Sequence, residues 1–292
     1  MWSPQKMQVI YTAHGFHFYK GAPLINWLLY YPVEKWLSKY TDKLILINKE
    51  DYDTAVAKKF KAKKIYKIDG IGVDAAKFNF VMSEDEKKKL KRELSSINKD
   101  FKIEKGDIVI TCVGELNKNK NQDLIIDVVG AIINRPQTNE LSVSQPNIKV
   151  LLVGAGPLKD HFEKRIESLG LKEHILLAGY RKDVPRILKI SDIAVCCSYR
   201  EGLPVNLIES QMSGLPCVVT NCRGNNEIVE ENKTGYIINL KDKKCKEKYT
   251  NKLLKLINSE TMRERMGKNA LENSKKYKLS RIMDVMKRIY EE

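Results

Sequence analysis

The sequence lacks the features of membrane-spanning and exported chains. No apolar run approaches the ~18 residues that a transmembrane helix requires, and no basic flank followed by an apolar core and a cleavage site is visible near the N-terminus. The six cysteines include no CxxC pair, and most of them lie within apolar runs. This pattern predicts reduced core thiols of a cytoplasmic protein, without disulfides or a zinc site.

Acidic residues are in short supply relative to basic ones, 37 against 52, which gives a net charge of +15. Lysine-rich solvated faces, an anionic membrane surface and nucleic acid would each explain this excess. The lysines are scattered and aromatic residues are not interleaved with them, which argues against a base-stacking surface. We therefore expect no nucleic-acid partner. Solvated faces and attachment to the inner face of the cytoplasmic membrane both remain open.

Short β-rich runs alternate with helical patterns over nearly the whole chain, as in parallel α/β folds. Helices are predicted over residues 23–40, 50–60 and 83–94, and each of the later strands except the last is followed by a helical pattern. The predicted strands are QVIYT, KLILIN, KIYKI, IVITCVG, KVLLVG, HILLAG, IAVCCS, PCVVT and GYIIN.

The predicted strands divide unequally between two domains. Residues 74–272 supply the six strands of a complete, doubly wound Rossmann-like domain, whereas residues 1–73 supply only three. We expect residues 1–73 to form a partial Rossmann-like domain. We expect residues 273–292 to form a C-terminal helix that packs back on this domain.

The segment SYREGLPVNLIES, which begins at Ser198, combines a strand end, a breaker and a helix. Pro204 suits the first turn of that helix, and Gly214 suits its C-terminal end. Glu201 is then expected in the loop at the carboxyl end of the strand, and Glu209 in the second helical turn. Ligands of open α/β sheets bind at this edge, and helix N-termini bind anions. Two carboxylates flanking an anion site fit a nucleoside diphosphate sugar; two solvated charges are the alternative.

This segment resembles the E-x7-E signature of the retaining glycosyltransferases of family 4, which have the GT-B fold of two Rossmann-like domains. The resemblance covers nearly the whole chain and implies a GT-B-like α/β fold with a complete donor domain and an N-terminally truncated acceptor-side domain. The other matching stretches are VGELNKNKNQDLI (113–125), LLVGAGPLKDHFEK (151–164), LLAGYRKDVPRILKISDIAV (176–195) and GLPCVVTNCRGNNEIVEENKTGYII (214–238).

The resemblance also implies roles for individual residues. Glu201 would act at the catalytic centre by binding hydroxyls of the transferred sugar, Glu209 would bind the ribose diol, and Lys120 would bind the diphosphate. Tyr180 and Arg181 would lie beside the nucleotide base. The remaining donor-binding residues implied are Gly114, Lys118, Gly202, Leu203, Pro204 and Val205.

The sequence departs from the family pattern in the first donor-domain loop. The family usually has Gly-Arg where this chain has Gly114-Glu115, and a carboxylate cannot clamp phosphate. Either Lys118 substitutes for the arginine or Lys120 acts alone; solvated loop lysines are the alternative. The family's Lys-Gly is Lys120-Asn121 here.

A histidine motif and a glycine motif also require interpretation. Strand QVIYT leads to His14, and the resemblance places a catalytic histidine there, facing the donor sugar; a lone structural histidine is the alternative, and His17 is a weaker candidate. Residues 154–157, Gly-Ala-Gly-Pro, lack the third glycine of a dinucleotide-binding fingerprint, so we expect a tight turn there.

The stretch PLINWLLYYPVEKWL has apolar residues at helical spacing. We expect Leu24, Trp27, Leu28 and Tyr31 to pack in the core. An interfacial helix that inserts into lipid is the alternative.

The resemblance implies a glycosyltransferase of capsular or exopolysaccharide synthesis. It would transfer a sugar with retention from a nucleotide-sugar donor, a UDP-sugar, to a lipid-linked or saccharide acceptor, without a metal or other cofactor. A truncated donor-binding remnant or subunit without catalysis is the alternative. A sugar-nucleotide epimerase of the same fold is a further alternative, which would isomerise its donor in the absence of an acceptor.

Overall fold

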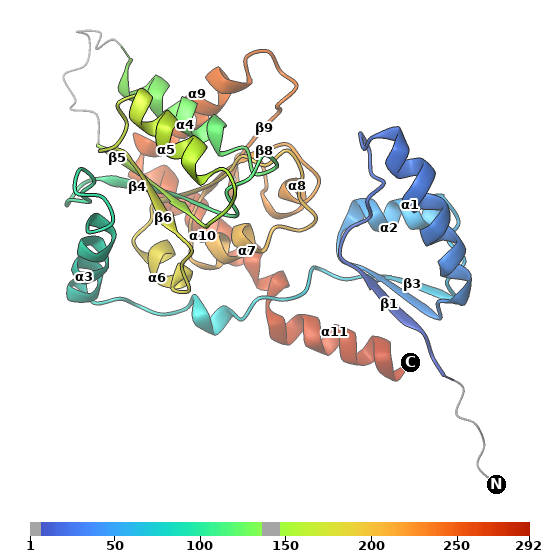
Figure 1. The fold of residues 1–292 in the computed structure, drawn as a ribbon. Coiled ribbons are helices and arrows are strands. Elements are labelled where there is room, and N and C mark those ends of the chain that lie inside the picture. The colour runs from blue at the N-terminus through green and yellow to red at the C-terminus, as the bar shows by residue number, and fades with distance from the viewer. Residues whose placement is uncertain (1–6, 136–146) are drawn as a thin grey trace. The chain divides into compact units, whose positions relative to one another are not determined.

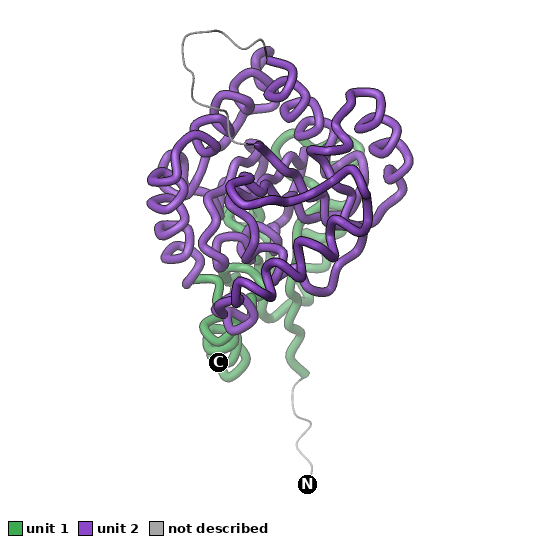
Figure 2. Tube along the Cα trace, turned by 90° about the vertical axis from the view of Figure 1, so that its left-hand side faces the viewer, with its two compact units in different colours: residues 1–73, 276–292 green, residues 74–275 purple. Residues whose placement is uncertain are grey.

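A computed structural model describes residues 7–135 and 147–292. The chain divides into two compact units (Figure 2). Unit 1 consists of Met1–Val73 and Lys276–Glu292, and unit 2 is Asp74–Lys275. No helix in the described part of the chain is both long and apolar enough to cross a bilayer.

Unit 1 contains a parallel sheet of three strands in the order β1-β2-β3. Its core is rich in aromatic side chains, with Phe16, Phe18 and Phe60 buried among residues of β2. Its elements are β1 (Ile10–Ala13), α1 (Leu24–Leu37), a 3-10 turn (Ser38–Tyr40), β2 (Lys43–Leu46), α2 (Lys49–Ala57), β3 (Lys64–Lys67), a second 3-10 turn (Lys275–Tyr277) that begins at the unit boundary, and α11 (Leu279–Glu291).

Polar contacts attach α11 to the sheet of unit 1. The buried Lys43 ammonium donates to the carbonyl oxygen of Ile289 over 2.5 Å. Lys64 and the Tyr66 hydroxyl both donate to the Glu292 carboxylate. Because these partners are more than 200 positions apart in sequence, the C-terminal helix closes unit 1 through long-range contacts.

The predicted core packing of α1 is only half right. Trp27 and Tyr31 pack against the Phe18 ring, at centroid distances of 5.4 Å each, but no α1 residue is fully buried. Leu24 is 81% exposed and Leu28 is 70% exposed. Apolar residues surround the whole helix, and the sheet can contact only one side of it, so its opposite face remains uncovered in the described part of the chain.

Unit 2 contains six parallel strands in the order β6-β5-β4-β7-β8-β9 (Figure 1). The strand order reverses between β4 and β7, which is the switch point at which doubly wound sheets bind ligands. The strands are β4 (Ile108–Val113), β5 (Ile148–Val153), β6 (Ile175–Gly179), β7 (Ile193–Cys196), β8 (Cys217–Thr220) and β9 (Gly235–Ile238).

Helices cover both faces of this sheet. One apolar cluster joins the sheet to α4, α5 and α9, and another joins it to α3 and α6, which explains why the strands are apolar throughout. The helical elements are a 3-10 turn (Ala75–Lys77), α3 (Glu84–Ser95), α4 (Gln122–Ile133), α5 (Lys159–Ser168), α6 (Val184–Lys189), α7 (Val205–Met212), α8 (Asn225–Ile228), α9 (Cys245–Ile257) and α10 (Glu260–Ser274).

We predicted no helix after the last strand, and this prediction was wrong, because α9 follows β9. The lysines that begin this helix obscure its apolar spacing. Tyr249, Leu253 and Leu256 nevertheless lie on one buried face.

Gly235 provides a test of the packing between β8 and β9. A Cβ atom at this position would lie 1.9 Å from the carbonyl oxygen of Cys217. We expect Gly235→Ala to destabilise the fold by about 3 kcal/mol, measured by urea unfolding. Gly130→Ala is the control: its Cβ would meet only Leu171 at 3.6 Å, and alanine favours a helix, so no loss is expected. Equal stability of the two variants would contradict this packing.

Candidate functional site

The loops that follow β4 and β7 meet at the switch point through an ion pair. The Lys120 Nζ atom lies 2.6 Å from Glu201 Oε1, and the Ser198 hydroxyl donates to the same oxygen over 2.6 Å. The lysine side chain is 23% exposed and the glutamate side chain 11%. Burial opposes the charge of Lys120, but the charge and hydrogen bond of Glu201 outweigh it and raise the pKa of Lys120. Two predicted site residues thus form one charged, largely buried pair.

Further hydrogen bonds hold these two loops together. The Tyr199 N–H donates to the backbone carbonyl of Asn119. The side-chain amide of Asn119 in turn donates to the Arg200 carbonyl over 2.9 Å. The Asn121 amide donates to the Cys197 carbonyl over 3.1 Å. Asn121 has φ +53°, a left-handed conformation that asparagine tolerates better than most residues. Asparagine is therefore compatible with the loop conformation at this position.

The loop after β5 packs closely against the loop after β4. A Cβ atom at Gly154 would lie 2.0 Å from the Gly114 carbonyl oxygen, and one at Gly156 would lie 2.4 Å from the Leu116 carbonyl oxygen. Packing thus explains both glycines, in agreement with the predicted turn. Gly114 also lies beneath the Lys120 side chain, because a Cβ there would be 3.5 Å from its Cδ and Cε atoms.

Glu209 lies in the second turn of α7, as predicted. The helix begins at Val205, so Pro204 precedes it, one residue earlier than predicted, and Gly214 with φ +78° follows its end. In the described part of the chain, the Glu209 carboxylate has no hydrogen bond or ion pair, and burial raises its pKa, opposed by the charge of Lys77. A half-buried carboxylate of this kind can accept hydrogen bonds from ligand hydroxyls.

The sequence predictions missed Arg223, which lies in the loop after β8. Its Nε–H donates to the Glu201 carbonyl oxygen over 3.2 Å. A Cβ atom at Gly224 would lie 2.5 Å from the Gly202 carbonyl oxygen and 2.6 Å from Pro204 Cδ, so the two loops are in direct contact. One sequence signal could have identified Arg223: it follows the strand PCVVT, and consecutive parallel strands place such residues at one sheet edge.

The other predicted donor-binding residues lie outside this cluster or beside it. Tyr180 and Arg181 follow the edge strand β6, two strands away from β4. Tyr180 is 73% exposed, and Arg181 makes two hydrogen bonds to Asp183, of 2.8 and 2.7 Å. Lys118 is exposed, and Gly202, Leu203 and Val205 are partly exposed around the start of α7. Within the described residues, Tyr180, Arg181 and Lys118 make no hydrogen bond or ion pair with the Lys120–Glu201 pair.

The two histidine candidates belong to unit 1. His14 follows β1 at the carboxyl end of the strand and is exposed. The His17 ring stacks on Tyr30 with a centroid distance of 4.6 Å. Within residues 7–135 and 147–292, no group of His, Cys, Asp and Glu side chains is arranged to hold a metal ion.

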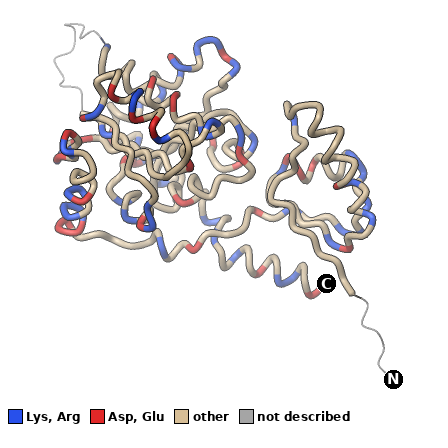
Figure 3. Tube along the Cα trace, viewed as in Figure 1, with Lys and Arg blue, Asp and Glu red and all other residues tan. Residues whose placement is uncertain are grey.

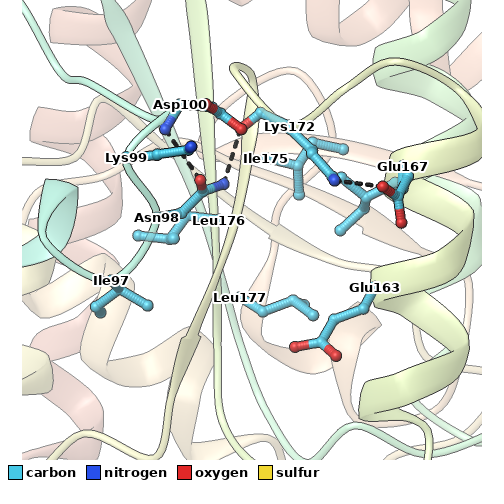
Figure 4. A pocket seen from close by; sticks show the side chains of 11 residues that line it. Ile97, Asn98, Lys99, Asp100, Glu163, Glu167, Lys172, Ile175, Leu176 and Leu177 are labelled. Carbon is cyan, nitrogen blue, oxygen red and sulfur yellow. Dashed lines mark hydrogen bonds and ion pairs between the residues drawn. The ribbon is translucent and has the colours of Figure 1, made fainter.

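A hollow of about 500 Å³ lies elsewhere in unit 2, along the edge strand β6 (Figure 4). Leu176 and Leu177 of β6, the 97–100 segment and α5 line it, and an ion pair between Lys172 and Glu167 crosses one side. None of the predicted site residues lines this hollow. The electrostatic features that suit an anionic ligand occur instead at the switch point.

Comparison with known proteins identifies the family. Residues 95–273 match the family described as glycosyl transferases group 1. EpsD of Bacillus subtilis (strain 168) is 33% identical over 283 residues, which cover 97% of this chain and 69% of EpsD. The chain belongs to the group 1 glycosyl transferases.

Two further similarities extend this result. The UDP-Gal:alpha-D-GlcNAc-diphosphoundecaprenol alpha-1,3-galactosyltransferase of Escherichia coli is 31% identical over 235 residues, or 80% of this chain and 57% of that protein. The crystal structure of Anabaena Alr3699/HepE in complex with UDP-glucose matches with a TM-score of 0.76 at 17% identity, covering 98% of this chain and 72% of that one. The predicted GT-B-like α/β fold of this group 1 glycosyl transferase is confirmed.

The raised pKa of Glu209 predicts an effect of pH on stability. A carboxyl group whose pKa is raised by folding stabilises the fold when protonated, and this contribution is lost as the pH rises through its folded pKa. Glu209→Gln should therefore melt at a higher temperature than the wild type at pH 7.5, and the difference should shrink as the pH falls below the ordinary value of 4.5. Calorimetry measures the melting temperatures of both proteins at each pH. Glu163→Gln, which removes an exposed carboxylate of α5, should show no such gain. A lower melting temperature for Glu209→Gln at pH 7.5 would refute the burial argument.

Proposed function

We propose that the protein transfers a sugar, with retention, from a nucleotide-sugar donor to a lipid-linked or saccharide acceptor in bacterial surface polysaccharide synthesis. The observation that carries this proposal is the Lys120–Glu201 pair at the switch point of the six-stranded sheet. Family membership supports it, as does the E. coli relative, whose name specifies a UDP-Gal donor and a diphosphoundecaprenol-linked acceptor. A UDP-sugar is the donor that we propose.

The donor would lie across the carboxyl ends of β4 and β7. The Lys120 ammonium has three N–H donors, so it can bind a diphosphate oxygen while it keeps its hydrogen bond to Glu201. The unpaired Glu209 carboxylate would accept hydrogen bonds from the ribose diol. Glu201, positioned by Ser198 and Lys120, would bind hydroxyls of the sugar that is transferred.

These contacts suit a transfer in which the acceptor attacks the anomeric carbon from the face that the diphosphate leaves. The acceptor oxygen forms a bond to that carbon, the bond from carbon to the diphosphate oxygen breaks, and a phosphate oxygen takes the acceptor proton. Lys120 would stabilise the negative charge of the departing diphosphate. No carboxylate base is required in this scheme, so Glu201 acts by binding and orienting the sugar. His14 of unit 1 is a further catalytic residue in this proposal.

Glu201→Gln tests this assignment. The amide keeps the size of the side chain but loses the negative charge that orients the sugar hydroxyls and Lys120. We expect transfer of radiolabelled sugar to fall at least about 100-fold. The melting temperature should still rise with a saturating nucleotide sugar, because donor at 100 times its Kd adds about 2.7 kcal/mol of stability.

The exposed Glu163→Gln variant controls for the substitution and should transfer sugar normally. Normal transfer by Glu201→Gln would contradict the assigned role. Donor-induced stabilisation of the wild type without any transfer would favour a donor-binding protein instead. Isomerised donor in the absence of acceptor would favour an epimerase.

We further propose that the uncovered face of α1 contacts the membrane in which a lipid-linked acceptor resides. This face includes Ile25, Leu29 and Trp36, all more than half exposed, and α1 carries few charges (Figure 3). Trp36 packs edge-on against the exposed Tyr40 ring at 5.3 Å, and Lys39 lies between them in sequence. Aromatic and basic residues beside an apolar face are typical of interfacial helices.

Leu29→Glu tests this contact. It places a charge among the exposed apolar residues of this face, so binding to phosphatidylglycerol vesicles, measured by flotation, should fall at least about tenfold. Leu271→Glu, at an exposed leucine of α10 in unit 2, should bind vesicles like the wild type. A wild type that self-associates, with Leu29→Glu monomeric and no vesicle binding by either, would assign the face to a second copy of the chain and contradict the membrane proposal.

A further inference from the structure

The predicted donor site is short of positive charge. A diphosphate group carries at least two negative charges, and Lys120 is already paired with Glu201. Glu115, five residues before Lys120 in the same loop, adds a negative charge. Its carboxylate accepts a hydrogen bond from Asn117 over 2.7 Å. A second cation is therefore needed from another part of the sheet edge.

We infer that Arg223 supplies this second cation and binds the diphosphate of the donor together with Lys120. This inference rests on the proposed function and adds a binding residue to the same site. Arg223 comes from the loop after β8, the strand next to β7. Its Nε–H donates to the carbonyl oxygen of Glu201, the residue whose side chain holds Lys120. Glu201 thus contacts both Arg223, through its backbone carbonyl, and Lys120, through its carboxylate.

Close backbone contact fixes Arg223 at this position. Gly224, the next residue, approaches Gly202 and Pro204 so closely that a Cβ atom would lie 2.5 Å from the Gly202 carbonyl oxygen. Gly202 and Pro204 lead into the N-terminus of α7, where the free N–H groups of an eight-residue helix favour an anion. The guanidinium is anchored at this helix start by its hydrogen bond to Glu201.

Arg223 suits this role better than the other nearby cations because of its position. A guanidinium has N–H donors in a planar fork that matches phosphate oxygens, and its Nε–H already bonds to Glu201 at the start of α7. Lys118 is exposed, and Arg181 follows the edge strand β6, two strands away from β4. Arg200 precedes Glu201 in the same loop, but its side chain is exposed.

Titration calorimetry with inorganic pyrophosphate tests this inference without knowledge of the base or sugar. We expect Arg223→Gln to weaken pyrophosphate binding at least about tenfold. Arg223→Lys should lose less pyrophosphate affinity, because lysine keeps the positive charge although it lacks the planar guanidinium group. Arg200→Gln removes the same charge from the adjacent loop and should stay within about twofold of the wild type. Binding of uridine, which has no phosphate, should be equal in the wild type and Arg223→Gln.

Two outcomes would overturn the role of Arg223 alone: pyrophosphate binding by Arg223→Gln within twofold of the wild type, or an equal loss in Arg200→Gln. A wild type that binds neither pyrophosphate nor UDP would overturn the proposed function as well. Melting of the ligand-free variants shows whether they fold. If Arg223→Gln does not, Arg223→Lys is compared with Arg200→Gln, and equal affinities overturn the inference.

Discussion

The ion pair between Lys120 and Glu201 joins the two halves of the six-stranded sheet at the carboxyl ends of β4 and β7. Its two residues belong to loops that leave neighbouring strands in opposite directions, so they meet only because β4 and β7 are adjacent. The pair is largely buried, and removal of either partner from such a pair leaves an uncompensated charge. The loops after β5 and β8 then pack around this pair through glycines that have no room for a side chain.

This arrangement accounts for the chemistry that we propose. The pair provides an ammonium for a diphosphate and a carboxylate for sugar hydroxyls at the same position. Within the described part of the chain, Glu209 remains unpaired and half buried. Burial of its charge costs free energy, and a hydrogen bond from a ligand hydroxyl would offset this cost. The proposed site thus combines an ion pair with a carboxylate to which we assign a ligand, as expected where function outweighs local stability.

Much of the fold was predictable from sequence, because each strand of the larger sheet is a short apolar run bounded by turn residues. The strand HILLAG, for example, corresponds to β6 within one residue. The position of Glu201 and Glu209 around the start of α7 was also predictable, from a strand end, a proline and a glycine. Strand order, in contrast, depends on contacts between distant segments. The proximity of Arg223 to Glu201, across 22 positions, therefore appeared only in the structure. The exposed face of α1 was not predictable either, because a helix with apolar residues on every side gives no sign of which side is covered.

The most direct test of the central claim is a crystal structure of the protein with bound UDP. We predict electron density for the diphosphate between the carboxyl ends of β4 and β7, with an oxygen atom within about 3 Å of the Lys120 ammonium and the ribose hydroxyls at Glu209. Diphosphate density elsewhere, such as in the hollow along β6, or a ribose distant from Glu209, would contradict it.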